Sequence, residues 1–136
     1  MSDRKSKYKL GTSVTLEKTF NAQDVEIFAE LTGDKNPVHL DEQYAAGTRF
    51  GKRIVHGMLI SSLFSTVFGT IFPGEGSIYM GQSLKFLKPV YLGEKITAKV
   101  TLTAIRDDKP IGSFETICLD ETGDVVVTGE ATLLLP

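Results

Sequence analysis

The sequence is poor in cysteine and histidine: its 136 residues include one cysteine and two histidines. The lone Cys118 cannot form an internal disulfide, and it lies in an apolar, β-branched run. The sequence places no basic neighbour beside it to lower the pKa of its thiol, as a nucleophilic role requires. We therefore expect Cys118 to be a small buried hydrophobic residue.

Neither sign of charge is in excess, because 15 Lys and Arg face 17 Asp and Glu, for a formal net charge of -2. This balance argues against general nucleic-acid binding, which needs a basic face. A local basic patch for a phosphorylated ligand is still allowed, since net charge does not fix the distribution of charge. Hydrophobic residues at 41% and charged residues at 24% are typical of a soluble globular protein. The length predicts a single domain, residues 1–136.

The sequence also lacks a clear targeting or membrane segment. Residues 1–9 are polar and have no apolar signal-peptide core, so we expect a frayed basic tail and a cytoplasmic location. Residues 54–72 carry no Asp, Glu, Lys or Arg, but they are few for a bilayer span and include several polar side chains. These are His56, Ser61, Ser62, Ser65, Thr66 and Thr70. A buried core helix explains this stretch better than a membrane span.

Helices are predicted in the first half of the chain, after a strand at residues 13–20. Asn21 is a suitable N-cap for a helix at 22–32, which Gly33 ends, and Asp41 can cap a short helix that runs to Ala46. Residues 34–40 and 47–52 are expected to be irregular loops. A long helix at 56–71 carries a wide apolar stripe. Its other face has small residues that would allow a sheet to approach closely, namely Gly57, Ser61, Ser65 and Gly69.

Strands are predicted throughout the second half. Apolar and polar residues alternate at 96–106, and further strands are expected at 77–89, 111–119 and 125–135 with turns at 107–110 and 121–124. A strand, then helices, then a run of antiparallel strands is an α+β pattern. With one very apolar helix, the pattern predicts the hotdog fold, an antiparallel sheet wrapped around a long central helix.

The most informative segment is residues 31–39, which places Asp34 and His39 five residues apart. Pro37 fixes its own φ and keeps Asn36 out of the α region, so the loop is stiff enough to position two proton-transfer groups. A carboxylate and an imidazole flanking one water could move protons between that water and a substrate. Asp34 and Asn36 are also common turn residues. A metal site on Asp34, His39 and Asp41 would need a further ligand that the sequence does not supply.

The start of the long helix is a second candidate element. A helix N-terminus offers free N–H groups that stabilise negative charge, and Gly57 would let a ligand reach the backbone. We interpret His56 as a structural or helix-start polar residue rather than as a second base.

These residues resemble the hydratase motif of the MaoC-like hydratases, in particular the stand-alone (R)-specific enoyl-CoA hydratases of polyhydroxyalkanoate supply. That motif begins with an aromatic residue, continues as Gly-Asp-x-Asn-Pro-hydrophobic-His, and ends on a small residue. Phe28, residues 33–39 and Ala45 fill these positions. The resemblance covers nearly the whole chain, since it extends through residues 54–58, 76–79, 81–84 and 128–131.

The resemblance implies a hydro-lyase that reversibly adds water to a trans-2-enoyl-CoA and forms an (R)-3-hydroxyacyl-CoA, without a cofactor or metal. Asp34 and His39 would be the catalytic pair, with the choice of base left open, and Asn36 would order the loop. The Gly57 N–H would be the oxyanion donor, and Ser65 matches a family serine near the catalytic water. The family also implies a homodimer that binds coenzyme A near the subunit junction.

Several alternatives are left open. A 3-hydroxyacyl-[acyl-carrier-protein] dehydratase would use the same chemistry on another carrier, whereas a hotdog acyl-CoA thioesterase has no need of the full motif. A non-catalytic thioester-binding protein would be expected to lack Asp34 or His39. Met58 and Phe68 are predicted to line the substrate pocket, although Phe68 could equally be core. Lys85 and Lys88 are predicted to lie on a solvated sheet face or, less simply, to hold coenzyme A phosphates.

Overall fold

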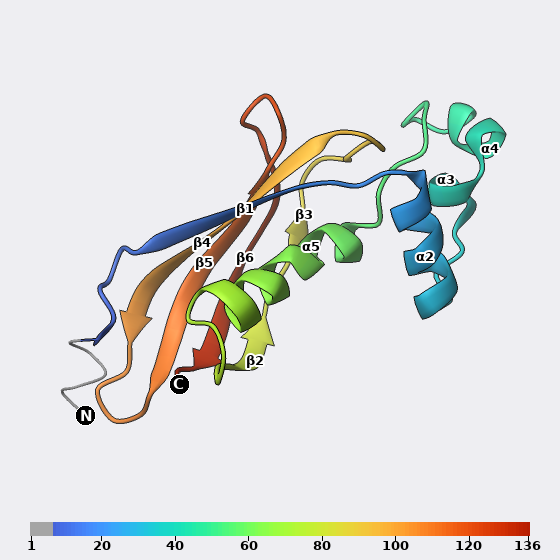
Figure 1. Ribbon diagram of the computed structural model, residues 1–136. Helices are drawn as coiled ribbons and strands as arrows, with labels where there is room; N and C mark the ends of the chain where they lie inside the picture. The colour runs from blue at the N-terminus through green and yellow to red at the C-terminus, as the bar shows by residue number, and fades with distance from the viewer. Residues whose placement is uncertain (1–6) are drawn as a thin grey trace.

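The computed structural model describes residues 7–136, so most of the expected N-terminal tail, residues 1–6, lies outside the described residues. Six strands of the described chain form one antiparallel sheet in the order β1-β4-β5-β6-β2, and β3 also pairs with β6 (Figure 1). Their bounds are β1 Ser13–Thr19, β2 Ile78–Gln82, β3 Lys85–Phe86, β4 Lys95–Ile105, β5 Ile111–Leu119 and β6 Val125–Leu134. The sheet and the helix on it confirm the predicted hotdog fold.

The alternating pattern of β4 explains which face of the sheet is buried. Ile96, Ala98, Val100 and Leu102 have no exposed surface, while the threonines and lysine between them are at least partly accessible. Successive side chains of a strand point to opposite faces, so these four residues form one apolar row under the helix. Cys118 of β5 is also fully buried, and burial raises the pKa of its thiol to about 12, which confirms the prediction for this residue.

The helix on the sheet consists of α5 (Gly57–Thr66) and a final wide turn, η1 (Val67–Ile71). Figure 1 shows α5 lying across β4, β5 and β6, which it contacts. Its side chains Phe64, Val67 and Phe68 are buried, and Phe68 packs edge-on against Phe114 of β5 with ring centroids 4.9 Å apart. The predicted helix at 56–71 is thus confirmed, with His56 as its N-cap. No helix of residues 7–136 is both long and apolar enough to cross a bilayer.

Among the described residues, three further helices gather at one end of α5: α2 (Ala22–Thr32), α3 (Pro37–Leu40) and α4 (Glu42–Ala46). The helix at 22–32 matches its prediction, and Asn21 and Asp24 form a reciprocal capping box. The predicted irregular loop at 34–40 is confirmed for residues 34–36 but was wrong for residues 37–40, because Asn36 caps α3 and Pro37 occupies its first turn. Proline suits that position, where its missing N–H has no helical partner to lose.

Two further expectations were wrong. Residues 77–89 form two short strands, β2 and β3, which both pair with β6 and are separated at Ser83, where the chain lies so close to β6 that a Cβ on Gly129 would be 1.8 Å from the Ser83 carbonyl oxygen. The small-residue face of the long helix does not pack on the sheet along its length. Ser61 is buried, but Ser65 and Gly69 are exposed in the single chain.

Candidate active site

Asp34 stands at the end of α2, where the chain turns out of the helix. Gly33 has a φ of 84°, a left-handed conformation that favours glycine and ends the helix. The Asp34 N–H donates to the Thr32 hydroxyl at 3.2 Å, and one carboxylate oxygen accepts the Asn36 N–H at 3.3 Å. The carboxylate is therefore oriented by its own turn, and its side chain is exposed in the single chain.

His39 is carried by α3, which the Asn36 side chain caps by accepting the Val38 N–H at 3.3 Å. Only 9% of His39 is exposed, and its Nδ1 lies 2.8 Å from the Ile54 carbonyl oxygen. Because a carbonyl can only accept, Nδ1 of His39 carries the proton. Its Nε2 is then left with a lone pair, the state in which it can accept a proton from water.

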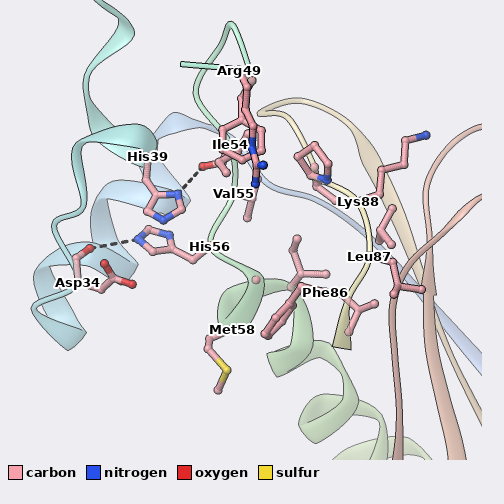
Figure 2. A pocket seen from close by; sticks show the side chains of 17 residues that line it. Asp34, His39, Arg49, Ile54, Val55, His56, Met58, Phe86, Leu87 and Lys88 are labelled. Carbon is pink, nitrogen blue, oxygen red and sulfur yellow. Dashed lines mark hydrogen bonds between the residues drawn. The ribbon is translucent and has the colours of Figure 1, made fainter. Parts of the chain in front are cut away.

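His56 lies against both residues (Figure 2). It is 2% exposed, its Nε2–H donates to the Asp34 backbone carbonyl at 3.1 Å, and its ring stacks on His39 with centroids 3.8 Å apart. Phe28 of α2 also packs against it, with ring centroids 4.6 Å apart. Burial lowers the pKa of His56 from its ordinary value, and a charge on His39 would lower it further, whereas the backbone carbonyl and the carboxylate of Asp34 act in the opposite direction. The net shift favours the neutral imidazole.

One carboxylate oxygen of Asp34 and one ring nitrogen of each histidine lie within 4.8 Å of one another. The histidine rings are stacked with centroids 3.8 Å apart and an interplanar angle of 27°, so lone pairs lying in these two planes are poorly placed to meet at one metal ion. Asp41, considered above as a ligand, instead caps α4 by accepting the Gln43 and Tyr44 N–H groups. The Asp34 carboxylate and the His39 ring, which lie within 4.8 Å of each other, are close enough to hold one water between them.

Arg53 supports this cluster and was missed by the sequence analysis. Its side chain is buried, its Nε donates to the His39 carbonyl at 2.7 Å, and its terminal nitrogens approach Glu42 at 3.7 Å and Glu26 at 4.0 Å. It therefore joins α2, α3 and α4. Nothing in the sequence separated Arg53 from its basic neighbours Arg49 and Lys52, except its position directly before the apolar pair at 54–55.

The helix N-terminus lies beside the cluster, as expected. His56 makes no capping bond with its side chain, so the N–H groups of the first turn of α5, beginning with Gly57, have no partner from the cap. A Cβ on Gly57 would lie 2.6 Å from the Phe86 ring, so this approach requires glycine. The first turn of α5 opens on a cavity of about 390 Å³, which Asp34, His39 and His56 also line. Its other walls include Arg49, Ile54, Met58, Phe86, Leu87 and Lys88 (Figure 2).

The remaining predicted site residues are not all gathered there. Met58 lines this cavity and a second one of about 430 Å³. Ser65 lines only the second, together with residues of β2, so a single chain does not bring Ser65 to Asp34 and His39. Phe68 lines neither cavity and is 1% exposed, which places it in the core. Lys88 lines the first cavity, but Asp120 and Asp124 hold its ammonium at 2.8 and 2.9 Å.

Residues 4–121 match the family model described as the MaoC like domain. An (R)-specific enoyl-CoA hydratase of Aeromonas caviae is 49% identical over 94% of this chain and 96% of its own. A mitochondrial 3-hydroxyacyl-[acyl-carrier-protein] dehydratase of Arabidopsis thaliana is 38% identical over 97% of this chain and 80% of its own. Among solved structures, an (R)-hydratase from A. caviae involved in PHA biosynthesis superposes with a TM-score of 0.93 at 49% identity, over 95% of this chain and 98% of that one.

Proposed function

The chain belongs to the family of MaoC-like domains, and from that membership we propose that it is an (R)-specific enoyl-CoA hydratase. It hydrates trans-2-enoyl-CoA to (R)-3-hydroxyacyl-CoA, reversibly, as a single domain spanning residues 1–136. The observation that carries this proposal is the juxtaposition of Asp34, the Nε2 acceptor of His39 and the start of α5 around one cavity. The product is of the class used in polyhydroxyalkanoate synthesis.

The reaction follows from these groups. A water held between Asp34 and His39 gives a proton to the pair as its oxygen bonds to C3 of the enoyl thioester. The C2=C3 electron pair moves toward the thioester carbonyl, whose developing negative charge the Gly57 N–H stabilises. The enolate then takes a proton from the pair at C2. Because Nδ1 of His39 is occupied by the Ile54 carbonyl, Nε2 of His39 is the nitrogen that exchanges protons with the water.

Asn36 holds Pro37 and His39 in α3 through its cap, so its role is to order the loop between the two catalytic residues. Met58 lies in the first turn of α5 and contributes an apolar wall of the cavity for the acyl chain. With one buried cysteine and no disulfide to form within the chain, the protein suits the reducing cytoplasm.

A second copy of the chain completes the enzyme as a homodimer. β2 is an edge strand, and exposed apolar side chains cluster on it and on the adjacent helix. Met58, Ile71, Ile78 and Met80 are each about half exposed, which is costly for a monomer in water. An antiparallel β2–β2 contact would cover them and close the second cavity, where Ser65 lies. Light scattering on the purified protein tests this; a monomer at micromolar concentration would contradict it.

The activity is tested with crotonyl-CoA, by following the loss of enoyl thioester absorbance and trapping the product with stereospecific dehydrogenases. We expect the (R)-product, and a loss of roughly 10²-fold or more in Asp34→Asn and His39→Gln. Asp108→Asn, an exposed residue paired with Arg106 in a distant hairpin, is the matched control and should keep full activity.

Two outcomes would contradict the proposal. Release of free coenzyme A without hydration would indicate a thioesterase. Turnover of a crotonyl carrier protein in preference to crotonyl-CoA would favour the dehydratase, a second candidate supported by the 38% identical Arabidopsis relative.

A further inference from the structure

His56 connects the parts of the active site without being needed for proton transfer. Its Nε2–H bonds to the Asp34 carbonyl, one face of its ring lies on His39, and Phe28 of α2 packs against it as well. It is also the residue directly before Gly57, so the oxyanion donor is the next N–H along the chain. A movement of the His56 ring would therefore change the relation between Asp34, His39 and α5.

We propose that His56 is a positioning residue that fixes the Asp34 backbone and the His39 ring relative to the Gly57 N–H, acting as a neutral imidazole with its proton on Nε2. This inference rests on the proposed function, because it assumes that Asp34 and His39 are the catalytic pair. It extends that function by giving His56 a defined protonation state and a defined partner.

The two stacked histidines must carry their protons on different nitrogens. Each has one nitrogen facing a backbone carbonyl: Nδ1 in His39 and Nε2 in His56. A carbonyl requires an N–H, and a neutral imidazole has a single proton. His39 is therefore the Nδ1–H tautomer and His56 the Nε2–H tautomer.

A second proton on His56 would be poorly placed. It would lie on Nδ1, which is buried and has no hydrogen-bond partner within residues 7–136. The titratable groups facing His56 are His39, stacked on its ring, and Asp34, which presents both its backbone carbonyl and a carboxylate whose charge opposes the lowering of the His56 pKa. When His39 takes a proton from water, a charged His56 would face it at a ring separation of 3.8 Å. Burial lowers the pKa of His56, in the direction that this geometry requires.

The first test is nuclear magnetic resonance of the nitrogen-15 labelled protein. The chain has two histidines, so long-range proton–nitrogen spectra contain two imidazole systems, and His56→Gln removes one of them. At about pH 7 we expect His56 as the neutral Nε2–H form and neutral His39 as the Nδ1–H form. A cationic or Nδ1–H His56 would overturn the inference. This readout needs no turnover, so it stands or fails independently of hydratase activity.

The second test compares His56→Gln with His56→Asn. The amide nitrogen of Gln is three bonds from Cβ, as Nε2 of His is, whereas that of Asn is only two bonds away. We expect His56→Asn to lower kcat about 10²-fold through misplacement of the catalytic groups, with KM within about threefold of wild type. His56→Gln should recover most of this kcat. Equal kcat values in the two variants would overturn the inference, as would wild-type kcat in both.

His56→Phe separates the hydrogen bond from the stacking. It keeps an aromatic ring against His39 but cannot donate to the Asp34 carbonyl, so its kcat should fall with that of His56→Asn. Wild-type kcat in His56→Phe would overturn the role of the donor. Thermal unfolding establishes that each variant is folded, and if His56→Asn is not, the comparison of His56→Gln with His56→Phe decides.

Discussion

Two polar clusters of this molecule, one around Asp120 and one around His56, differ in how fully their hydrogen-bonding groups are used. Asp120 is buried, and both of its carboxylate oxygens accept: one from the Thr122 N–H and hydroxyl and the Asp124 N–H, the other from Lys88. In the His56 cluster, Nδ1 of His56 and a terminal nitrogen of Arg53 are buried without a hydrogen-bond partner in the described part of the chain.

The difference separates a structural cluster from a functional one. Buried polar groups that are left unpaired lower stability, so a fold keeps few of them. The Asp120 cluster closes the turn between β5 and β6, and both carboxylate oxygens of Asp120 are occupied by hydrogen bonds within it. The His56 cluster borders a cavity and a helix N-terminus whose N–H groups are not capped by a side chain. We therefore expect changes in the first to reduce stability and changes in the second to reduce activity.

The largest effect is expected for Gly57→Ala. The new Cβ would lie 2.6 Å from the Phe86 ring, so either the ring or the start of α5 must move. Displacing the oxyanion donor should lower kcat about 10³-fold. The overpacking should also lower the free energy of unfolding by about 1–2 kcal/mol. Steady-state kinetics with crotonyl-CoA and chemical denaturation measure the two effects.

Two further variants sharpen this prediction. Gly47→Ala, whose Cβ would make only an ordinary 3.5 Å contact with the Tyr44 carbonyl oxygen, is the matched control and should change neither quantity. Adding Phe86→Leu to Gly57→Ala makes room for the methyl group and should recover part of the lost activity. Full activity in Gly57→Ala alone would contradict this prediction, because it would show that the Phe86 ring moves aside and the start of α5 is not displaced.

Asp120→Ala should have the opposite profile. It removes a buried carboxylate that accepts four hydrogen bonds, so the free energy of unfolding should fall by about 2 kcal/mol. The kcat of the folded variant should stay within about twofold of wild type, because Asp120 lies outside the active site. A loss of activity larger than the loss of stability would contradict the division between the two clusters.

The same carboxylate predicts a dependence on pH. Lys88, followed by Thr122, holds the pKa of Asp120 well below its usual range. When folding lowers the pKa of a group, the ionised group stabilises the folded protein at pH values above the pKa that it has in the unfolded chain. That unfolded pKa is about 4 for Asp. The stabilisation is lost as the pH falls through the pKa of the group in the folded protein. The stability difference between wild type and Asp120→Ala should therefore be constant from neutral pH to about 5 and shrink in stronger acid.

A smaller effect on both quantities is expected for Arg53→Lys. A lysine keeps the charge but cannot donate from Nε to the His39 carbonyl while also reaching Glu26 and Glu42. We expect kcat to fall about tenfold through movement of α3, and the free energy of unfolding to fall by about 1 kcal/mol. Arg106→Lys, on an exposed hairpin, is the control. Unchanged kcat in Arg53→Lys would show that Arg53 does not position His39.

The two clusters also differ in how far the sequence could predict them. Asp34 and His39 were predicted because a short motif of fixed spacing contains both, and α2 and β5 because periodicity and caps are local signals. Residues 37–40 were misjudged as loop because an N-cap followed by proline is compatible with either outcome. The partners of His56 and Arg53 come from segments up to 28 residues away, so only the folded chain reveals them.

The contacts of Lys88 were harder still to predict, since it bonds to residues 32 and 36 positions away and its sequence context predicted only a solvated sheet face.

The two acidic partners of Lys88 provide the smallest and last prediction. Asp124 accepts from Lys88 at 2.9 Å, nearly the same distance as Asp120, but 63% of its side chain is exposed against 3% for Asp120. Water screens an exposed ion pair, so Asp124→Asn should lower the free energy of unfolding by only about 0.5 kcal/mol or less. Chemical denaturation at low and high salt measures this, and the small loss should shrink further at high salt. A loss as large as that of Asp120→Ala would show that burial of the carboxylate is not what makes the Asp120 cluster structural.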